Sequence, residues 1–150
     1  MGRRTKAREC ALQMLYQWEI TREPMDKVAE SFWRVRTTTD ETRARAERLA
    51  RGAQEQVATI DGAIASVSAH WLLERLAAVD LCILRLGTYE LMMERSTPPA
   101  VILDEAVEIA KRFGEAETPA FVNGILDAIM RQVRGGLPPA EAGAKVKERP

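Results

Sequence analysis

The residues best suited to chemistry are basic ones near the start of the chain. Arg3, Arg4, Lys6 and Arg8 place four positive charges within six residues, and Glu9 is the first acidic residue to follow. Cations at the start of a helix gain nothing from the helix dipole, so another role would explain them. On an exposed arm they can neutralise phosphates, and arginine also stacks on bases. The pattern indicates a nucleic-acid contact, although basic starts also occur on proteins that bind no nucleic acid.

An aromatic residue near the far end is a second candidate. Apolar residues at helical spacing from 122 to 133 predict a buried stripe, and Phe121 lies about a right angle away from its centre. At the rim of a helix N-terminus, its ring would offer a stacking surface beside N–H groups that attract anions. The alternative is that Phe121 packs under the preceding loop, as aromatic side chains often do.

The sequence contains no recognisable catalytic constellation. It has no glycine-rich phosphate loop and no nucleophile elbow, and His70 is its single histidine. Asp104 and Glu108 lack the partners of a di-metal site, so a solvated helix face explains them better. Cys10 and Cys82 are far apart and neither belongs to a CxxC motif. We therefore expect no catalytic residue, no cofactor and no metal, and a protein that is not an enzyme.

Composition and charge narrow the class further. The chain has 150 residues, with 22 Lys and Arg balanced by 22 Asp and Glu. Zero formal charge argues against a generic nucleic-acid packaging protein but not against a local basic surface. A second basic run, formed by Arg43, Arg45, Arg48 and Arg51, is interleaved with acidic residues, which favours a solvated face. The 46% hydrophobic and 29% charged content is typical of a globular domain.

The sequence also indicates a compartment. The basic start lacks the apolar core of a secretory signal. The most hydrophobic stretch, 76–93, is interrupted by Asp80, Arg85 and Glu90, which would be costly in a bilayer. We therefore expect a cytoplasmic protein whose two cysteines are buried and reduced.

Helical periodicity dominates the chain and predicts an all-α fold. The second of these helices opens at Pro24, and the third opens at a capping box formed by Thr38 and Glu41. The folded domain is expected to cover 1–136, with a basic arm at 1–8 and a disordered tail at 137–150. The expected helices cover residues 7–18, 24–35, 38–67, 71–94, 98–113 and 118–135.

Three blocks of the sequence together resemble the NusB family. The first reads RRTKARECALQMLYQW over residues 3–18. The second covers residues 71–90 and contains Arg75-Leu76, Val79-Asp80, Ile83-Leu84-Arg85 and Tyr89-Glu90. The third reads DEAVEIAKRFG at 104–114, followed by FVNGIL at 121–126. The blocks occur in family order and span nearly the whole chain apart from the tail.

This resemblance implies two small helical bundles packed across one another, with about six to seven helices. It also implies a transcription antitermination factor that binds single-stranded boxA RNA together with the ribosomal protein NusE. Such a factor supports assembly of the antitermination complex on RNA polymerase during ribosomal RNA transcription. The implied RNA contacts are Arg3, Arg4, Lys6, Arg8, Glu117 and Phe121, and the implied NusE contacts are Tyr16 and Asp80.

One departure and several alternatives accompany the resemblance. Relatives can carry a lysine just before the aromatic residue, where this chain has Ala120. The resemblance allows a monomer or a homodimer. One alternative is a detached module like the one that precedes ribosomal RNA cytosine methyltransferases. Another is a purely structural helical interaction domain with an incidental basic arm.

Overall fold

The computed structural model describes residues 2–69 and 72–135, and within these ranges all regular structure is helical. The predicted all-α class is therefore confirmed. The tail at 137–150 and His70 lie outside the described residues. The helices are α1 (Arg3–Thr21), α2 (Met25–Arg34), α3 (Asp40–Glu55), α4 (Val57–Ser66), α5 (Leu72–Arg75), α6 (Ala78–Met93), α7 (Pro99–Phe113) and α8 (Thr118–Val133).

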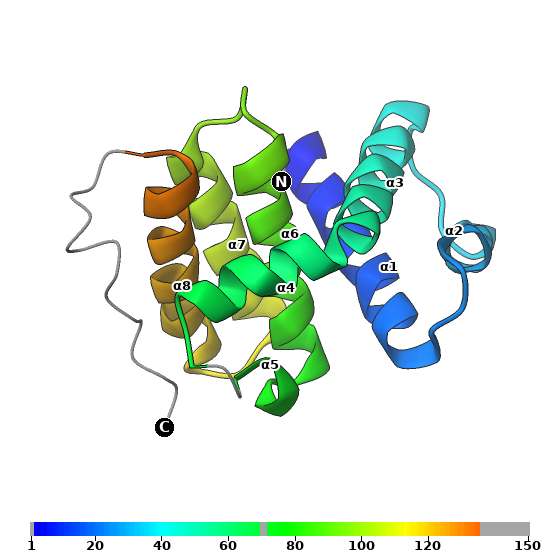
Figure 1. Ribbon diagram of the computed structural model, residues 1–150. Helices are drawn as coiled ribbons and strands as arrows, with labels where there is room; N and C mark the ends of the chain where they lie inside the picture. Colours follow the sequence, from blue (N-terminus) through cyan, green and yellow to red (C-terminus); the bar gives the residue numbers. More distant parts are fainter. Residues whose placement is uncertain (1, 70–71, 136–150) are drawn as a thin grey trace.

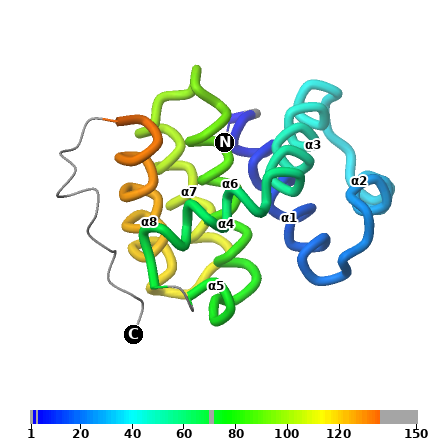
Figure 2. Tube along the Cα trace, viewed as in Figure 1, coloured from blue at the N-terminus to red at the C-terminus, as the bar shows by residue number. Residues whose placement is uncertain are grey.

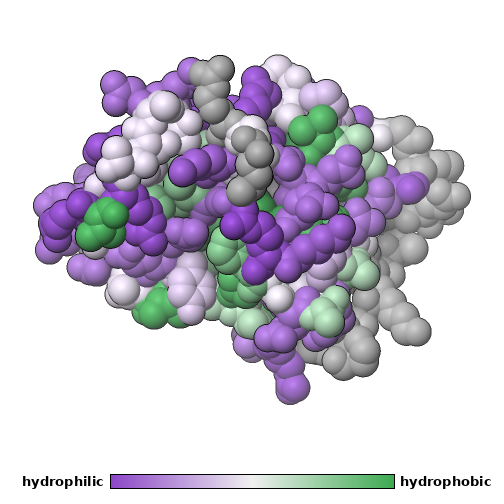
Figure 3. All heavy atoms as spheres, turned by 180° about the vertical axis from the view of Figure 1, so that it is seen from behind, coloured by the Kyte–Doolittle hydropathy of each residue, from purple (hydrophilic) through white to green (hydrophobic). Residues whose placement is uncertain are grey.

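The helices form two bundles that share a common core. Helices α1, α2 and α3 make one bundle, and α6, α7 and α8 make the other, with α4 crossing against α6 and α8 (Figure 1). Helix α1 contacts α6 as well as α3, so the start of the chain lies between the two bundles (Figure 2). On the face opposite to that view, hydrophilic side chains cover most of the surface (Figure 3).

Helix α6 is the centre of the second bundle. Every residue from Asp80 to Leu91 is buried, which agrees with the near-continuous apolarity of this segment. Such a helix must be covered on all sides, and α1, α3, α4, α7 and α8 each contact it. Four of its polar or charged side chains are therefore buried as well: Asp80, Arg85, Thr88 and Glu90.

Residues 38–67, expected as one helix, form two. The chain bends at Gln56, where φ is −99° and ψ is 16°, and α4 leaves in a new direction. Helix α3 consequently packs mainly on α1 and also contacts α6, whereas α4 packs on α6 and α8. The spacing of apolar residues in threes and fours continues across the bend because α3 and α4 each keep a buried face. The N-cap of α3 is Thr39, one residue after the predicted position, and its hydroxyl accepts a hydrogen bond from the Thr42 N–H at 3.1 Å.

A close approach between α3 and α6 explains a glycine inside α3. A Cβ atom on Gly52 would overlap the ring of Tyr89. The absence of a side chain therefore lets α6 approach α3, although glycine weakens a helix by roughly 1 kcal/mol relative to alanine.

The bundles are also joined by a buried arginine. Arg85 on α6 donates from Nε and Nη2 to the two Asp61 oxygens at 2.9 and 2.8 Å, and from Nη1 to Glu19 at 2.6 Å. Burial lowers the pKa of Arg85, but the hydrogen bonds to Asp61 and Glu19 outweigh it and the net shift is upward. The pairs hold α1, α4 and α6 in a fixed relation.

Both cysteines are free and buried, as expected. Burial raises the pKa of the Cys82 thiol to about 12, so this group stays protonated at neutral pH. In 2–69 and 72–135, no helix combines the length and apolarity that a bilayer-spanning segment needs.

Candidate nucleic-acid and partner interfaces

The basic residues at the chain start lie on the first turns of α1 rather than on an extended arm. The helix begins at Arg3, and the Lys6 N–H donates to the Gly2 carbonyl at 3.2 Å. Arg4 and Lys6 are exposed, and no carboxylate of the described residues pairs with either of them. The side chain of Arg3 lies outside the described part of the structure. Arg4 and Lys6 are thus hydrated cations available to an anionic ligand.

Arg8 has a different role from the one predicted. Its side chain is only 1% exposed, and its Nε donates to both oxygens of Glu90 at 2.8 and 3.0 Å. Its Nη1 donates to Glu105 at 3.1 Å. A guanidinium buried among two carboxylates does not reach a phosphate on the surface. The prediction that Arg8 contacts RNA is therefore corrected, because Arg8 instead holds α1 against α6 and α7.

The charge network continues onto α3. Arg45 lies 3.9 Å from Glu90 and 3.7 Å from Glu94, and Arg48 pairs with Glu94 at 2.6 Å. Burial raises the pKa of Glu90, while Arg8 opposes this rise. Burial also lowers the pKa of Arg45, and the positive charge of Arg8 adds to that effect. Arg48 fits the solvated face predicted for the second basic run, whereas Arg45 is largely buried.

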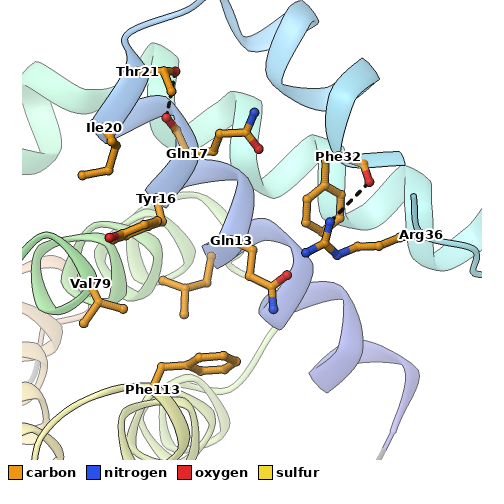
Figure 4. Close-up of a pocket in the computed structure, with 10 residues that line it drawn as sticks. Gln13, Tyr16, Gln17, Ile20, Thr21, Phe32, Arg36, Val79 and Phe113 are labelled. Carbon is orange, nitrogen blue, oxygen red and sulfur yellow. Dashed lines mark hydrogen bonds between the residues drawn. The ribbon is translucent and has the colours of Figure 1, made fainter. Parts of the chain in front are cut away.

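An apolar groove of about 660 Å³ lies further along α1. Tyr16 and Ile20 from α1 are 43% and 58% exposed there. Val79 from α6 and Phe113 from α7 approach from the other side (Figure 4). Of these residues the sequence indicated only Tyr16. A groove that gathers apolar side chains from three helices, with those of α1 exposed and Val79 and Phe113 partly buried, is suited to a protein partner.

Asp80, the other predicted partner contact, is buried. It is 1% exposed, and it accepts a hydrogen bond from the Thr118 hydroxyl at 3.3 Å. The Thr118 hydroxyl in turn accepts from the Glu115 N–H at 2.9 Å. Asp80 therefore ties the first turn of α6 to the first turn of α8, and its contact with a protein partner stays a prediction. Its neighbour Val79 lines the groove.

The predicted base-contact region is partly exposed and partly buried. Glu117 is exposed and is the N-cap residue of α8. Phe121 is only 7% exposed and belongs to the hydrophobic core, so its ring is not a free stacking platform. Its position four residues before the buried Ile125 was a sequence signal for this packing. Ala120 lies exposed beside it and lines a surface cavity with Lys111.

Helix α7 contacts the first turns of α1. Thr5 and Arg8 of α1 contact Glu105 in the first half of α7, and Glu9 pairs with Arg112 near its end. The first turns of α1 therefore lie along α7, and Glu117 follows the last turn of α7. Arg4 and Lys6 point to different sides of α1, because Arg4 lines a pocket with Arg45 and Arg48, whereas Lys6 lines one with Trp33 and Arg36.

The fold and these surfaces define a helical adaptor, a binding protein with a basic surface and an apolar groove on the same helix. The model of the NusB family matches residues 5–131. The chain belongs to the NusB family, and it is a transcription antitermination factor rather than an enzyme.

Similar proteins extend over almost the whole chain. The transcription antitermination protein NusB of Sorangium cellulosum (strain So ce56) is 49% identical over 129 residues, which cover 86% of this chain and 92% of that protein. The protein of the same name from Anaeromyxobacter dehalogenans (strain 2CP-1 / ATCC BAA-258) is 41% identical over 145 residues, covering 96% and 99%. These relatives are antitermination proteins rather than methyltransferases.

Solved structures show the same fold. T. maritima NusB has a TM-score of 0.80 and 37% identity, and the match covers 88% of this chain and 92% of that one. A structure of the antitermination factors NusB and NusE in complex with double-stranded RNA has a TM-score of 0.79 and 27% identity, with coverage of 88% and 98%. The predicted family and fold are confirmed.

Proposed function

We propose that this protein binds boxA-type RNA together with NusE and supports assembly of the antitermination complex on RNA polymerase during ribosomal RNA transcription. The observation that supports this most directly is the division of α1 into two exposed surfaces. Its start carries the exposed cations Arg4 and Lys6, and its later turns carry Tyr16 and Ile20 in the apolar groove. An adaptor needs two such surfaces, one for the RNA and one for the protein.

The RNA contact rests on Arg3, Arg4 and Lys6, with Glu117 at a second point. Exposed cations bind phosphates by releasing counterions, and this effect does not depend on sequence. A carboxylate such as Glu117 can accept hydrogen bonds from base amino groups, which adds sequence preference. Arg8 acts as a positioning residue because it fixes the first turns of α1. Phe121 shapes the start of α8 from inside the core.

The NusE contact rests on Tyr16 and on the apolar groove around it. Tyrosine is enriched at the centre of protein interfaces because its ring buries a large area while its hydroxyl keeps a hydrogen bond. Asp80 supports this surface indirectly by fixing the start of α6, where Val79 enters the groove. We further propose that the protein acts in the cytoplasm, where nascent RNA is made.

The test is an RNA-binding titration with boxA RNA, with and without NusE, across a salt series. With three phosphate contacts, the logarithmic salt slope on single strands should be about −2. NusE should tighten the binding of boxA RNA and leave a scrambled RNA of the same length unaffected. A duplex boxA probe decides between single-stranded and double-stranded RNA. A slope near zero, or equal binding of boxA and scrambled RNA with NusE present, would contradict the proposal.

A further inference from the structure

A polar cavity lies between α1 and the segment that joins α2 to α3. Its volume is about 290 Å³, close to the lower end of the range for small-ligand pockets. It lies between the basic surface, with which it shares Lys6, and the apolar groove. The residues that carry polar chemistry there are Lys6, Gln13, Trp33, Arg36, Thr37 and Thr38.

The charge balance of this cavity is positive. In the described ranges neither Lys6 nor Arg36 pairs with a carboxylate, whereas the nearby Arg34 pairs with Glu30 at 3.2 Å. The one carboxylate in the lining, Glu9, is itself paired with Arg112. Two uncompensated cations thus face one concave site.

The thiol of Cys10 in the cavity wall reflects these charges. Burial raises its pKa, and both Lys6 and Arg36 act to lower it. Lys6 on α1 and Arg36 on the segment between α2 and α3 line the same cavity as this thiol.

Arg36 is held in place by Phe32. Its guanidinium lies 4.1 Å from the centre of the Phe32 ring and donates from Nη1 to the Phe32 carbonyl at 3.5 Å (Figure 4). Stacking on an aromatic face restricts the guanidinium while leaving most of its N–H groups free to bind a ligand. Arg36 and Gln13 line both this cavity and the apolar groove, so the two adjoin each other.

The lining also supplies neutral donors. Thr37 and Thr38 contribute hydroxyl groups, and the Trp33 ring forms part of the cavity wall. Cations beside hydroxyl donors form a set that binds a phosphate group.

We propose that this cavity binds a phosphate of the RNA backbone and so extends the RNA-contact surface from Lys6 across Arg36 to the edge of the apolar groove. This inference rests on the proposed function, and it adds a site on the α2–α3 connection. RNA held there would pass directly beside the bound protein partner. Each partner would then limit the motion of the other.

The test compares Arg36→Gln with Arg34→Gln. Arg34 lies two residues away, is exposed and pairs with Glu30, and it does not line the cavity, so it is a matched control for the loss of one positive charge. Arg36→Gln should weaken boxA RNA binding about 5- to 10-fold. It should also reduce the magnitude of the salt slope by about 0.7, whereas Arg34→Gln should change neither. Circular dichroism melts check that both variants fold.

A second measurement needs no RNA. Inorganic phosphate is titrated into the isotope-labelled protein while the Trp33 indole and the Thr37 and Thr38 amide resonances are followed. Phosphate should shift these resonances in the natural protein and not in Arg36→Gln.

The RNA titration and the phosphate titration together distinguish failure of the cavity assignment from failure of the proposed function. If the natural protein binds boxA RNA but Arg36→Gln behaves like Arg34→Gln, the cavity assignment is overturned and the proposed function stands. If RNA fails to bind at all, the proposed function and the RNA assignment both fail. Phosphate-induced shifts would then show that the cavity serves a small phosphorylated molecule instead.

Discussion

Positive residues on the first turns of α1 lie in two opposite environments, one buried and one exposed. Arg8 lies inside the molecule, with its guanidinium held by Glu90 and Glu105. Arg4 and Lys6, within four residues of Arg8 on the same helix, face solvent without a paired carboxylate in the described structure. A buried charge without its partner is strongly destabilising, whereas an exposed unpaired charge is hydrated and free to bind. A positive charge therefore stabilises the fold in one place and stays accessible to a ligand in the other.

The largest expected effect comes from breaking the buried group. Arg8→Ala leaves Glu90 buried without its main partner and should lower the free energy of unfolding by about 3–5 kcal/mol. The double variant Arg8→Met/Glu90→Leu should recover part of this loss because it removes both charges. Urea unfolding followed by circular dichroism measures both variants. Stability unchanged in Arg8→Ala would show that Arg8 is not part of the folded core.

The comparison of buried with exposed residues also applies to the two predicted NusE contacts, of which Asp80 is the buried one. Asp80→Ala should lower the free energy of unfolding by about 2–3 kcal/mol, since the Thr118 hydroxyl loses a buried charged acceptor. The same urea titration measures it. Weaker NusE binding with full stability would instead place Asp80 in the interface.

Tyr16 is the exposed counterpart of Asp80. Tyr16→Asp should weaken NusE binding by about 30-fold, corresponding to about 2 kcal/mol for a central interface tyrosine. Its stability should stay within about 0.5 kcal/mol of the natural protein, because the side chain is 43% exposed. Calorimetric titration with NusE gives the affinity. Gln17→Glu adds the same negative charge beside it and serves as a control for charge alone.

The exposed cations are tested together. Arg4→Ala/Lys6→Ala should reduce the magnitude of the RNA salt slope by about 1.4 and weaken binding about 10-fold at moderate salt. Its unfolding curve should match that of the natural protein. Lys27→Ala, which removes an exposed cation from α2, should leave RNA binding intact. A double variant with an unchanged slope would show that the basic start of α1 makes no phosphate contact.

The smallest expected effect concerns Ala120. Ala120→Lys restores a cation that relatives can carry, on the exposed first turn of α8. It should strengthen RNA binding about threefold and steepen the salt slope by about 0.7. Filter-binding curves at several salt concentrations suffice. Equal affinity in Ala120→Lys and Ala120→Gln would mean that RNA does not pass this turn.

The sequence predicted much of the fold and part of the candidate site. Most helix positions followed from local periodicity, but the segments 38–67 and 71–94, each expected as one helix, are broken at residue 56 and at residues 76–77. Tyr16, Arg4 and Lys6 are exposed, as a binding role requires. Arg8 was misplaced although it lies three and four residues before the buried Ala11 and Leu12, which puts it on the inner face of α1. Its positive charge argued for exposure, and only the opposing Glu90 and Glu105 make its burial possible.

The sequence by itself determined the helical class, the family and the presence of a local basic surface, because these depend on residue types and on spacing within one segment. The tertiary structure decided which charges are neutralised, since Arg8 and Glu90 are 82 residues apart in the chain. It also decided the bend at Gln56, the burial of Asp80 and Phe121, and the cavity that joins Lys6 to Arg36. Each of these depends on which distant segment packs against a residue, and periodicity within one helix carries no information about that partner.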